Sequence, residues 1–225
     1  MSTIIQTWFY LIDESYENTI YIEKNIYVSL LFKNTKTDII LDIWENTKVD
    51  VYGFFSEASP ENIIIHQNKN HSSLNVKMLF IENKTHLSSN IISKINAHSS
   101  SSNIHIVSMV QENKISINSS LEIEKNNTKV LARLDLENIF LWKNGSIHSL
   151  PNLFIKANDV KVSHSSKTHR LDENKLFYLK SRGLDTKTST SLLLESYFSK
   201  LFSCIQMLDK KTFDINQTDF LNLIN

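Results

Sequence analysis

Glycine and proline are scarce in this chain of 225 residues, which contains 3 Gly and 2 Pro. Sandwiches and barrels made of many β-hairpins usually place Gly, Pro or Asn-Gly at their turns, and Asn144-Gly145 is the one Asn-Gly pair in the sequence. Turns must therefore use Asn, Ser and Lys, or tight hairpins do not connect the strands. The abundance of Asn, Ile, Lys and Ser is typical of a genome rich in A and T, and it says little about function.

The sequence also lacks cysteine pairs, an excess of one charge and long apolar runs. A single cysteine, Cys204, excludes an internal disulfide and a metal site made of four cysteines from one chain. The 24 basic residues balance 24 acidic ones, so the basic excess of nonspecific nucleic-acid binding is missing. No apolar run approaches the roughly 20 residues of a membrane span, and the N-terminus does not resemble a signal peptide. We therefore expect a cytoplasmic protein whose partners include neither nucleic acid nor membrane.

Short strands are expected along most of the chain. Apolar and polar residues alternate in segments such as 103–110, 114–118, 130–137 and 153–157, and this period of two is typical of strands with one buried face. Short strands with little hairpin chemistry fit a parallel β-helix, in which each strand stacks on its counterpart in the next turn and Asn and Ser occupy the corners. An antiparallel sandwich with unusual turns fits as well, and periodicity alone does not decide between them.

The pattern becomes helical after His164. Residues 171–183 predict a short helix, because acidic residues open it, basic residues close it and Gly183 suits the position just beyond its end. A second helix is expected after Asp185 and a third over 214–224. The apolar stripe expected on the second helix consists of Leu192, Leu193, Tyr197, Phe198, Leu201, Phe202 and Ile205. The expected domains are an N-terminal segment (1–19), a β-helix body (20–165) and a C-terminal helical lobe (166–225).

The junction between the two patterns carries a recognisable motif. Residues 149–164 read SLPNLFIKANDVKVSH, and Leu171-Asp172-Glu173 and LFYLKSRG at 176–183 follow. In order and spacing this resembles the C-terminal part of the SufB/SufD family, scaffold proteins of iron–sulfur cluster assembly with the signature P-x-L-x-I-x-A-D-D-V-K-x-S-H-G-A-T. The resemblance covers about residues 130–200. It implies a mainly β fold, a right-handed parallel β-helix body with a small C-terminal α-helical lobe, and so favours the β-helix over the sandwich.

The resemblance also implies a function. In this family a SufB-type and a SufD-type scaffold pair through their β-helix ends, and each helical lobe docks a SufC-type ABC ATPase. His164 corresponds to the histidine of the motif, whereas Val162 stands where SufB-type chains often carry a cysteine. We therefore expect a non-catalytic, SufD-like scaffold, with His164 as a ligand of a transient iron–sulfur cluster shared with the partner chain. A homodimer of the isolated chain is a further expected assembly.

Contacts with the ATPase are expected on the first helix. The resemblance places Phe177, Tyr178 and Arg182 at the docking surface, and aromatic and arginine side chains are those that anchor interfaces. A core position is equally open for Phe177. Cys204 is interpreted as a small core residue of the second helix. Trp8, Trp44 and Trp142 are expected in the core or at its rim.

Departures from the family pattern leave other functions open. Ser165-Ser166-Lys167 replaces Gly-Ala-Thr after the histidine, Asn158 replaces the first Asp, and the family's N-terminal helical domain is not recognisable. The chain could thus be a reduced working scaffold or a degenerate structural subunit without a metal role. A carbohydrate-active β-helix enzyme is the alternative from another class, because Asp135 and Glu137 share one face of a strand and Asp159 is near in sequence. A zinc site formed by His164 and His169, five residues apart, has weak support.

Overall fold

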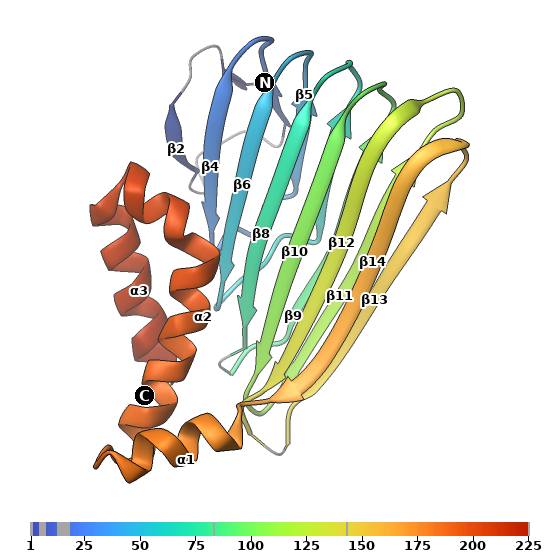
Figure 1. Cartoon of the computed structure of the whole chain (residues 1–225). Coiled ribbons are helices and arrows are strands. Elements are labelled where there is room, and N and C mark those ends of the chain that lie inside the picture. Colours follow the sequence, from blue (N-terminus) through green and yellow to red (C-terminus); the bar gives the residue numbers. More distant parts are fainter. Residues whose placement is uncertain (1, 5–7, 13–18, 83, 143, 225) are drawn as a thin grey trace.

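The computed structural model describes residues 2–4, 8–12, 19–82, 84–142 and 144–224. In these residues the chain forms two seven-stranded sheets and then a set of C-terminal helices (Figure 1). Successive strands alternate between the sheets, and neighbouring strands within each sheet pair in parallel. This arrangement confirms the parallel β-helix with a C-terminal helical lobe and excludes the antiparallel sandwich.

Odd-numbered strands make one sheet and even-numbered strands the other. The odd sheet contains β1 (Ser2–Ile4), β3 (Thr19–Ile22), β5 (Ile39–Ile43), β7 (Asn62–Gln67), β9 (Leu87–Ile95), β11 (Lys114–Ile123) and β13 (Ser146–Ile155). The even sheet contains β2 (Phe9–Ile12), β4 (Tyr27–Lys33), β6 (Lys48–Phe55), β8 (Ser73–Ile81), β10 (Ser101–Val110), β12 (Thr128–Phe140) and β14 (Asp159–Arg170). Strands thus extend past both expected limits of the 20–165 body, since β1 and β2 precede residue 20 and β14 ends at Arg170.

Asparagine often occupies the corner between an odd-numbered strand and the even-numbered strand that follows it. The residues with positive φ at this corner are Asn25, Asn46, His71, Ser99 and Asn126. Asparagine adopts this left-handed conformation more readily than other side-chain-bearing residues. Adjacent corners are bonded to each other, as where the N–H of Asn46 donates to the carbonyl of Asn70 at 3.2 Å. A chain with few glycines can therefore turn repeatedly without hairpins.

Stacked aliphatic side chains fill the space between the sheets. Register places Leu30, Val51, Val76, Ile104 and Leu134 directly above one another, and all of them are buried. Comparable rows from the odd sheet complete this inner core. Burial of such rows is the main favourable contribution to the fold.

The helices α1 (Glu173–Ser181), α2 (Thr186–Leu208) and α3 (Lys210–Ile224) follow the last strand. In Figure 1, α2 and α3 lie side by side against the outer face of the even sheet, where a second apolar cluster joins them to β4, β6, β8, β10 and β12. Phe198 lies at the centre of this cluster, with its ring centroid 5.9 Å from that of Phe54 and 5.2 Å from that of Phe220. The lobe is thus packed on the β-helix through aromatic contacts.

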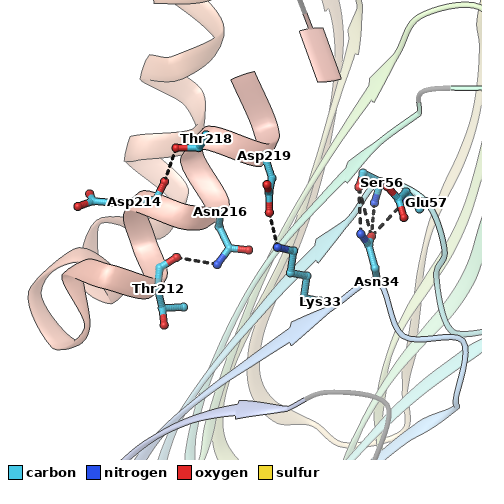
Figure 2. Close-up of polar contacts among 9 residues, drawn as sticks. All are labelled: Lys33, Asn34, Ser56, Glu57, Thr212, Asp214, Asn216, Thr218 and Asp219. Atoms are coloured by element: carbon cyan, nitrogen blue, oxygen red, sulfur yellow. Dashed lines mark hydrogen bonds and ion pairs between the residues drawn. The ribbon is translucent and has the colours of Figure 1, made fainter. Parts of the chain in front are cut away.

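Polar contacts fix α3 against the same sheet. Figure 2 shows the Lys33 ammonium at the end of β4 bonded to the Asp219 carboxylate of α3. Next to it, Asn34 Oδ1 accepts hydrogen bonds from the backbone N–H groups of Ser56 and Glu57, which joins the bend after β4 to the residues that follow β6 (Figure 2). The contact between Lys33 and Asp219 joins residues that are 186 positions apart in the sequence.

The first two helices lie where the sequence analysis predicts them, and the start of the third differs. Asp172 and Asp185 cap α1 and α2, and Gly183 adopts φ +91° beyond the end of α1. The expected third helix begins earlier than residue 214. On α2 the stripe is wrong at one position, because Leu192 is exposed and Leu194 is buried instead.

The tryptophans lie at the surface. Trp8, Trp44 and Trp142 are all exposed, so the core position considered for them is wrong and the rim position fits. Each lies close to a connection or at the start of an edge strand.

Candidate functional site

The β-helix ends in an open turn formed by β13 and β14. These strands are the outermost members of the two sheets at this end of the part of the chain that the structure describes. Leu150, Phe154 and Ile155 of β13 are exposed, and Val160 and Val162 of β14 are half-buried against the inner core. An edge strand offers unpaired backbone groups to another chain. The open end thus combines apolar side chains with free backbone hydrogen-bonding groups.

His164 terminates the main aliphatic row of the inner core. It pairs in register with Leu134, so the stacked row passes from aliphatic side chains to an imidazole at the open end. Val160 and Val162, which precede it at intervals of two, face the same side of β14. With no further turn stacked on it in the described residues, the His164 side chain is exposed.

One imidazole is too few ligands for a metal centre. The His164 ring makes no hydrogen bond or ion pair with the residues that the structure describes. Nor do those residues contain any group of three or more His, Cys, Asp or Glu side chains that could hold a metal ion. An exposed, unengaged imidazole is nevertheless suited to bind a metal ion. A cluster could therefore be held here only if a second chain supplied the other ligands.

His169 does not join His164, although it lies on the same strand. An odd separation along a strand places two side chains on opposite faces. His169 lies on the outer face, where its Nε2 is 2.8 Å from Glu137 Oε1 and its ring centroid is 6.3 Å from that of Tyr197 on α2. The zinc pair considered from sequence is therefore not formed.

Glu137 is the centre of a charged cluster on the outer face of β10, β12 and β14. Its carboxylate lies 3.7 Å from His105 Nε2, 2.8 Å from His169 Nε2 and 3.3 Å from Lys167 Nζ. The interaction with His105 is the largest cause that lowers the pKa of Glu137, to about 2; burial opposes it, and His169 and Lys167 add to it. The carboxylate thus stays ionised and joins three neighbouring strands.

Asp135 and Glu137 share one face of β12, and Asp159 is not in register with either of them. Asp135 accepts hydrogen bonds from Arg133 Nε and from Ser165 Oγ, which lower its pKa against the opposing effect of burial. Asp159 lies at the start of β14, six residues before the Ser165 that pairs with Asp135. Paired acid–base chemistry requires carboxyl groups that face one substrate, and Asp135 and Glu137 are instead engaged with basic neighbours.

The helix α1 presents the expected partner-binding residues to solvent. None of its residues is buried, and Phe177 is 75% exposed, so the core position considered for this side chain is wrong. The Arg182 guanidinium lies over the Tyr178 ring, 5.3 Å from its centroid.

Residues of α1 line two hollows of about 500 Å³ each. One is lined by α1 alone, including Phe177 and Lys180. The other lies between α1, α2 and the strand ends and includes Leu176 and Leu194. A helix without a buried residue, with an exposed aromatic ring and apolar hollows beside it, has the features of a protein-binding surface.

Cys204 lies on α2, half-buried against the second apolar cluster. This position fits the core role expected for it. It is remote from the open end, because it is near the end of α2 that approaches β4 and β6.

The Glu137 cluster is the feature that sequence reasoning missed. Its members come from strands about 30 residues apart, and the strand register decides which of them meet. The sequence contains one signal of it, the spacing of two that places Asp135 and Glu137 on one face of a strand, and this signal is also the basis of the carbohydrate-active enzyme alternative. In the structure, Asp135 and Glu137 bond to side chains of β12 and of the neighbouring strands.

Comparison with known proteins identifies the family to which this chain is similar. Residues 42–197 match the family described as "SUF system FeS cluster assembly, SufBD core domain". The match begins well before residue 130, where the motif resemblance starts. It therefore includes turns of the β-helix that the motif resemblance does not cover.

Individual relatives are similar over shorter segments. The iron–sulfur cluster assembly protein SufD of Escherichia coli is 22% identical over 103 residues, which are 46% of this chain and 24% of that protein. The chloroplastic protein ABCI7 of Arabidopsis thaliana is 36% identical over 63 residues, 28% of this chain and 13% of that protein. A SufBD family protein of Mycobacterium leprae is 36% identical over 69 residues, 30% of this chain and 18% of that protein.

The chain therefore matches a quarter or less of the length of these relatives. None of the helices in the described residues is both long enough and apolar enough to cross a membrane. The family match extends over more than half of the chain and agrees with its parallel β-helix and C-terminal helices. The chain belongs to the SufBD family of SUF-system iron–sulfur cluster assembly proteins.

Proposed function

We propose that this chain is a SufD-like scaffold subunit without catalytic activity of its own, which assembles with a SufB-type scaffold and a SufC-type ATPase in the cytoplasm. The observation that carries the proposal is the position of His164, an exposed imidazole at the end of the buried aliphatic row in an open β-helix. A relative named as SufD and the family match point in the same direction.

Pairing would take place at the open end. A second β-helix placed against β13 and β14 would cover the exposed Ile155 and the half-buried Val162. It could also satisfy the free backbone groups of these edge strands. Apolar burial and backbone hydrogen bonding together would make such an interface specific and stable.

The cluster is the cargo of this scaffold and not a resident cofactor. His164 would supply one nitrogen ligand, and a thiolate of the SufB-type chain would supply another, because this chain has no cysteine in its β-helix. Shared ligation makes the site dependent on the geometry of the interface. A small rotation between the chains would then suffice to assemble or release the cluster.

The ATPase would dock on α1. Phe177, Tyr178 and Arg182 are the candidate anchors, since they are exposed and the Arg182 guanidinium is oriented by the Tyr178 ring. Because α1 leads directly from β14, movement of a docked ATPase would reach the open end through one short segment. ATP-driven closure of two such ATPases would thus change the scaffold interface.

Anaerobic co-expression with the cognate SufB-type chain and ATPase tests the proposal. The complex is purified with wild-type chain, with His164→Ala and with His148→Ala, and iron and sulfide are measured. His148 is the matched control, because it is also exposed but lies on the outer side of β13. We expect all three to form the complex, and His164→Ala alone to lose most of its iron and sulfide.

Two other results would each contradict part or all of the proposal. A complex whose iron and sulfide are the same in all three versions would make the chain an architectural subunit without a ligand. Failure of the wild-type chain to form any complex would contradict the scaffold function itself.

A further inference from the structure

The inner face of β14 changes from apolar to polar along the strand. Val160 and Val162 are half-buried against the inner core. His164, Ser166 and Thr168 follow at intervals of two and are exposed. Because alternate residues of a strand face the same side, these five side chains form one line across the open end. The line has an apolar half at the start of the strand and a polar half that begins at His164.

Contacts on the opposite face of β14 show that Ser166 points inward. Ser165 Oγ donates a hydrogen bond to Asp135 Oδ1 at 2.6 Å. Lys167 Nζ donates to Glu137 Oε1 at 3.3 Å. These bonds hold both neighbours of Ser166 on the outer face of the strand. The Ser166 side chain therefore lies on the inner face.

Ser166 ends an apolar row of the inner core in the same way as His164 does. Register pairs Ser166 with Leu136, and Leu136 continues the row to Ile106 and Met78 in the turns below. These three side chains are buried. The Ser166 hydroxyl makes no hydrogen bond with the residues that the structure describes. The row is thus apolar in the turns that are covered and ends in a free hydroxyl in the uncovered turn.

Asn138 extends the polar half of the open end into the turn below. It is 5% exposed, pairs in register with Thr168, and donates from Nδ2 to Thr168 Oγ1 at 3.3 Å. Its Oδ1 has no hydrogen-bond partner among the described residues. A buried amide that is only partly bonded costs stability compared with an apolar side chain. The polar half is therefore formed by two turns of the β-helix and is not confined to exposed side chains.

Hydroxyl groups are the hydrogen-bond donors that neighbour His164 on this face. Lys161 and Lys167 of the same strand alternate with the inward line and face outward. Ser166 is two residues from His164, about 6–7 Å along the strand, and a serine hydroxyl can donate one hydrogen bond. The sulfides of an iron–sulfur cluster accept hydrogen bonds, which help to set its reduction potential. An imidazole and a hydroxyl donor on one uncovered face therefore suit a group made of iron ions and sulfide.

We propose that Ser166 is a second contact of this chain with the cluster, and that its hydroxyl donates a hydrogen bond to a sulfide. The inference rests on the proposed function and adds to His164 a residue that acts on the sulfide and not on the iron. The family signature has alanine at this position, so the hydroxyl belongs to this chain and not to the signature. The apolar half, with Val160 and Val162, is left for contact with the partner chain.

Two variants of the same shape test the hydroxyl. Ser166→Thr keeps it, and Ser166→Val replaces it by a methyl group. Each is purified anaerobically with the SufB-type chain and the ATPase, and iron, sulfide and the reduction potential of the bound cluster are measured. A hydrogen bond to sulfide favours the reduced cluster, because reduction adds negative charge to the acceptor. We expect Ser166→Thr to keep the wild-type potential and Ser166→Val to shift the reduction equilibrium about tenfold toward the oxidised cluster, about 59 mV for one electron.

Ser163→Val is the matched control, because Ser163 is also exposed on β14 but pairs with Arg133 on the outer face. It should leave the potential unchanged. A cluster lost from the assembled Ser166→Val complex alone would also support the inference. Equal potentials of the Thr and Val variants, loss of the cluster from both, or failure of Ser166→Val to assemble would overturn it. A wild-type complex without iron and sulfide would instead contradict the proposed function, and this inference with it.

Discussion

Glu137 shows how single side chains connect turns of a β-helix that the backbone ladder already joins. Its carboxylate is 15% exposed and contacts residues of the strands on both sides. Its pKa is depressed to about 2, first through His105. A group with a depressed folded pKa stabilises the protein above its unfolded pKa, and that contribution is lost as the pH falls through the folded value.

Replacement Glu137→Gln should therefore lower stability at neutral pH and reduce its acid dependence. From a pKa that moves from 4.5 to about 2, we expect a loss of roughly 2–3 kcal/mol at pH 7. The difference between wild type and variant should shrink as the pH falls from about 4.5 toward 2. Urea unfolding followed by circular dichroism at several pH values measures it.

Glu124→Gln is the matched control for this prediction. Glu124 also bonds to a lysine, Lys156, but the pair is exposed to solvent, where such pairs contribute little. Equal effects of the two substitutions at every pH would contradict the role assigned to the His105–Glu137–His169 contacts.

At the scale of the element, α2 is held to the β-helix by its aromatic side chains. Phe198 is fully buried and lies within 6 Å of the ring centroids of Phe54, Phe202, Phe213 and Phe220. Removing a ring from such a position leaves a cavity that the surrounding rings can only partly fill.

We expect Phe198→Ala to destabilise the chain by about 3–5 kcal/mol. Phe177→Ala is the control with the same chemical change, and it should have almost no effect on stability because Phe177 is exposed. Thermal and urea unfolding compare the two. A small effect of Phe198→Ala would mean that the lobe is not packed on the sheet as described.

The helix α1 differs from α2 because it has no buried residue. Under the proposed function, its exposed aromatic side chains contact the ATPase. Phe177→Ala should weaken ATPase binding by at least about tenfold, the effect typical of an interface anchor.

Calorimetry with the purified ATPase measures this change, and Ile215→Ala on α3 is the control, since Ile215 is also exposed but lies on another helix. If both variants bind the ATPase as the wild type does, α1 is not the docking helix.

The sequence predicted the elements better than the contacts between them. Period-two alternation, the scarcity of glycine and the capping residues Asp172 and Asp185 all depend on local backbone chemistry, which a single sequence displays. The cluster around Glu137 and the row that ends in His164 depend on register between strands about 30 residues apart. The error at Leu192 has the same origin, because the direction in which α2 docks decides which side of its apolar stripe is buried.

In the residues that the structure describes, the molecule is a β-helix with helices over its even sheet and with β13 and β14 as its uncovered last turn (Figure 1). Coverage of the even sheet leaves the β13–β14 end as a large apolar and backbone surface without a described neighbour. The proposed function depends on this end pairing with another scaffold chain.

The mass of the assembled complex tests this claim most directly. Ile155→Glu places a charge at the open end on a side chain that is exposed in the single chain, and Leu131→Glu makes the same change on the outer face of β12. Light scattering after co-purification with the SufB-type partner should find the heterodimer with wild type and Leu131→Glu, and separate chains with Ile155→Glu. A heterodimer that forms equally well with Ile155→Glu, or none with the wild type, would contradict pairing through the open end.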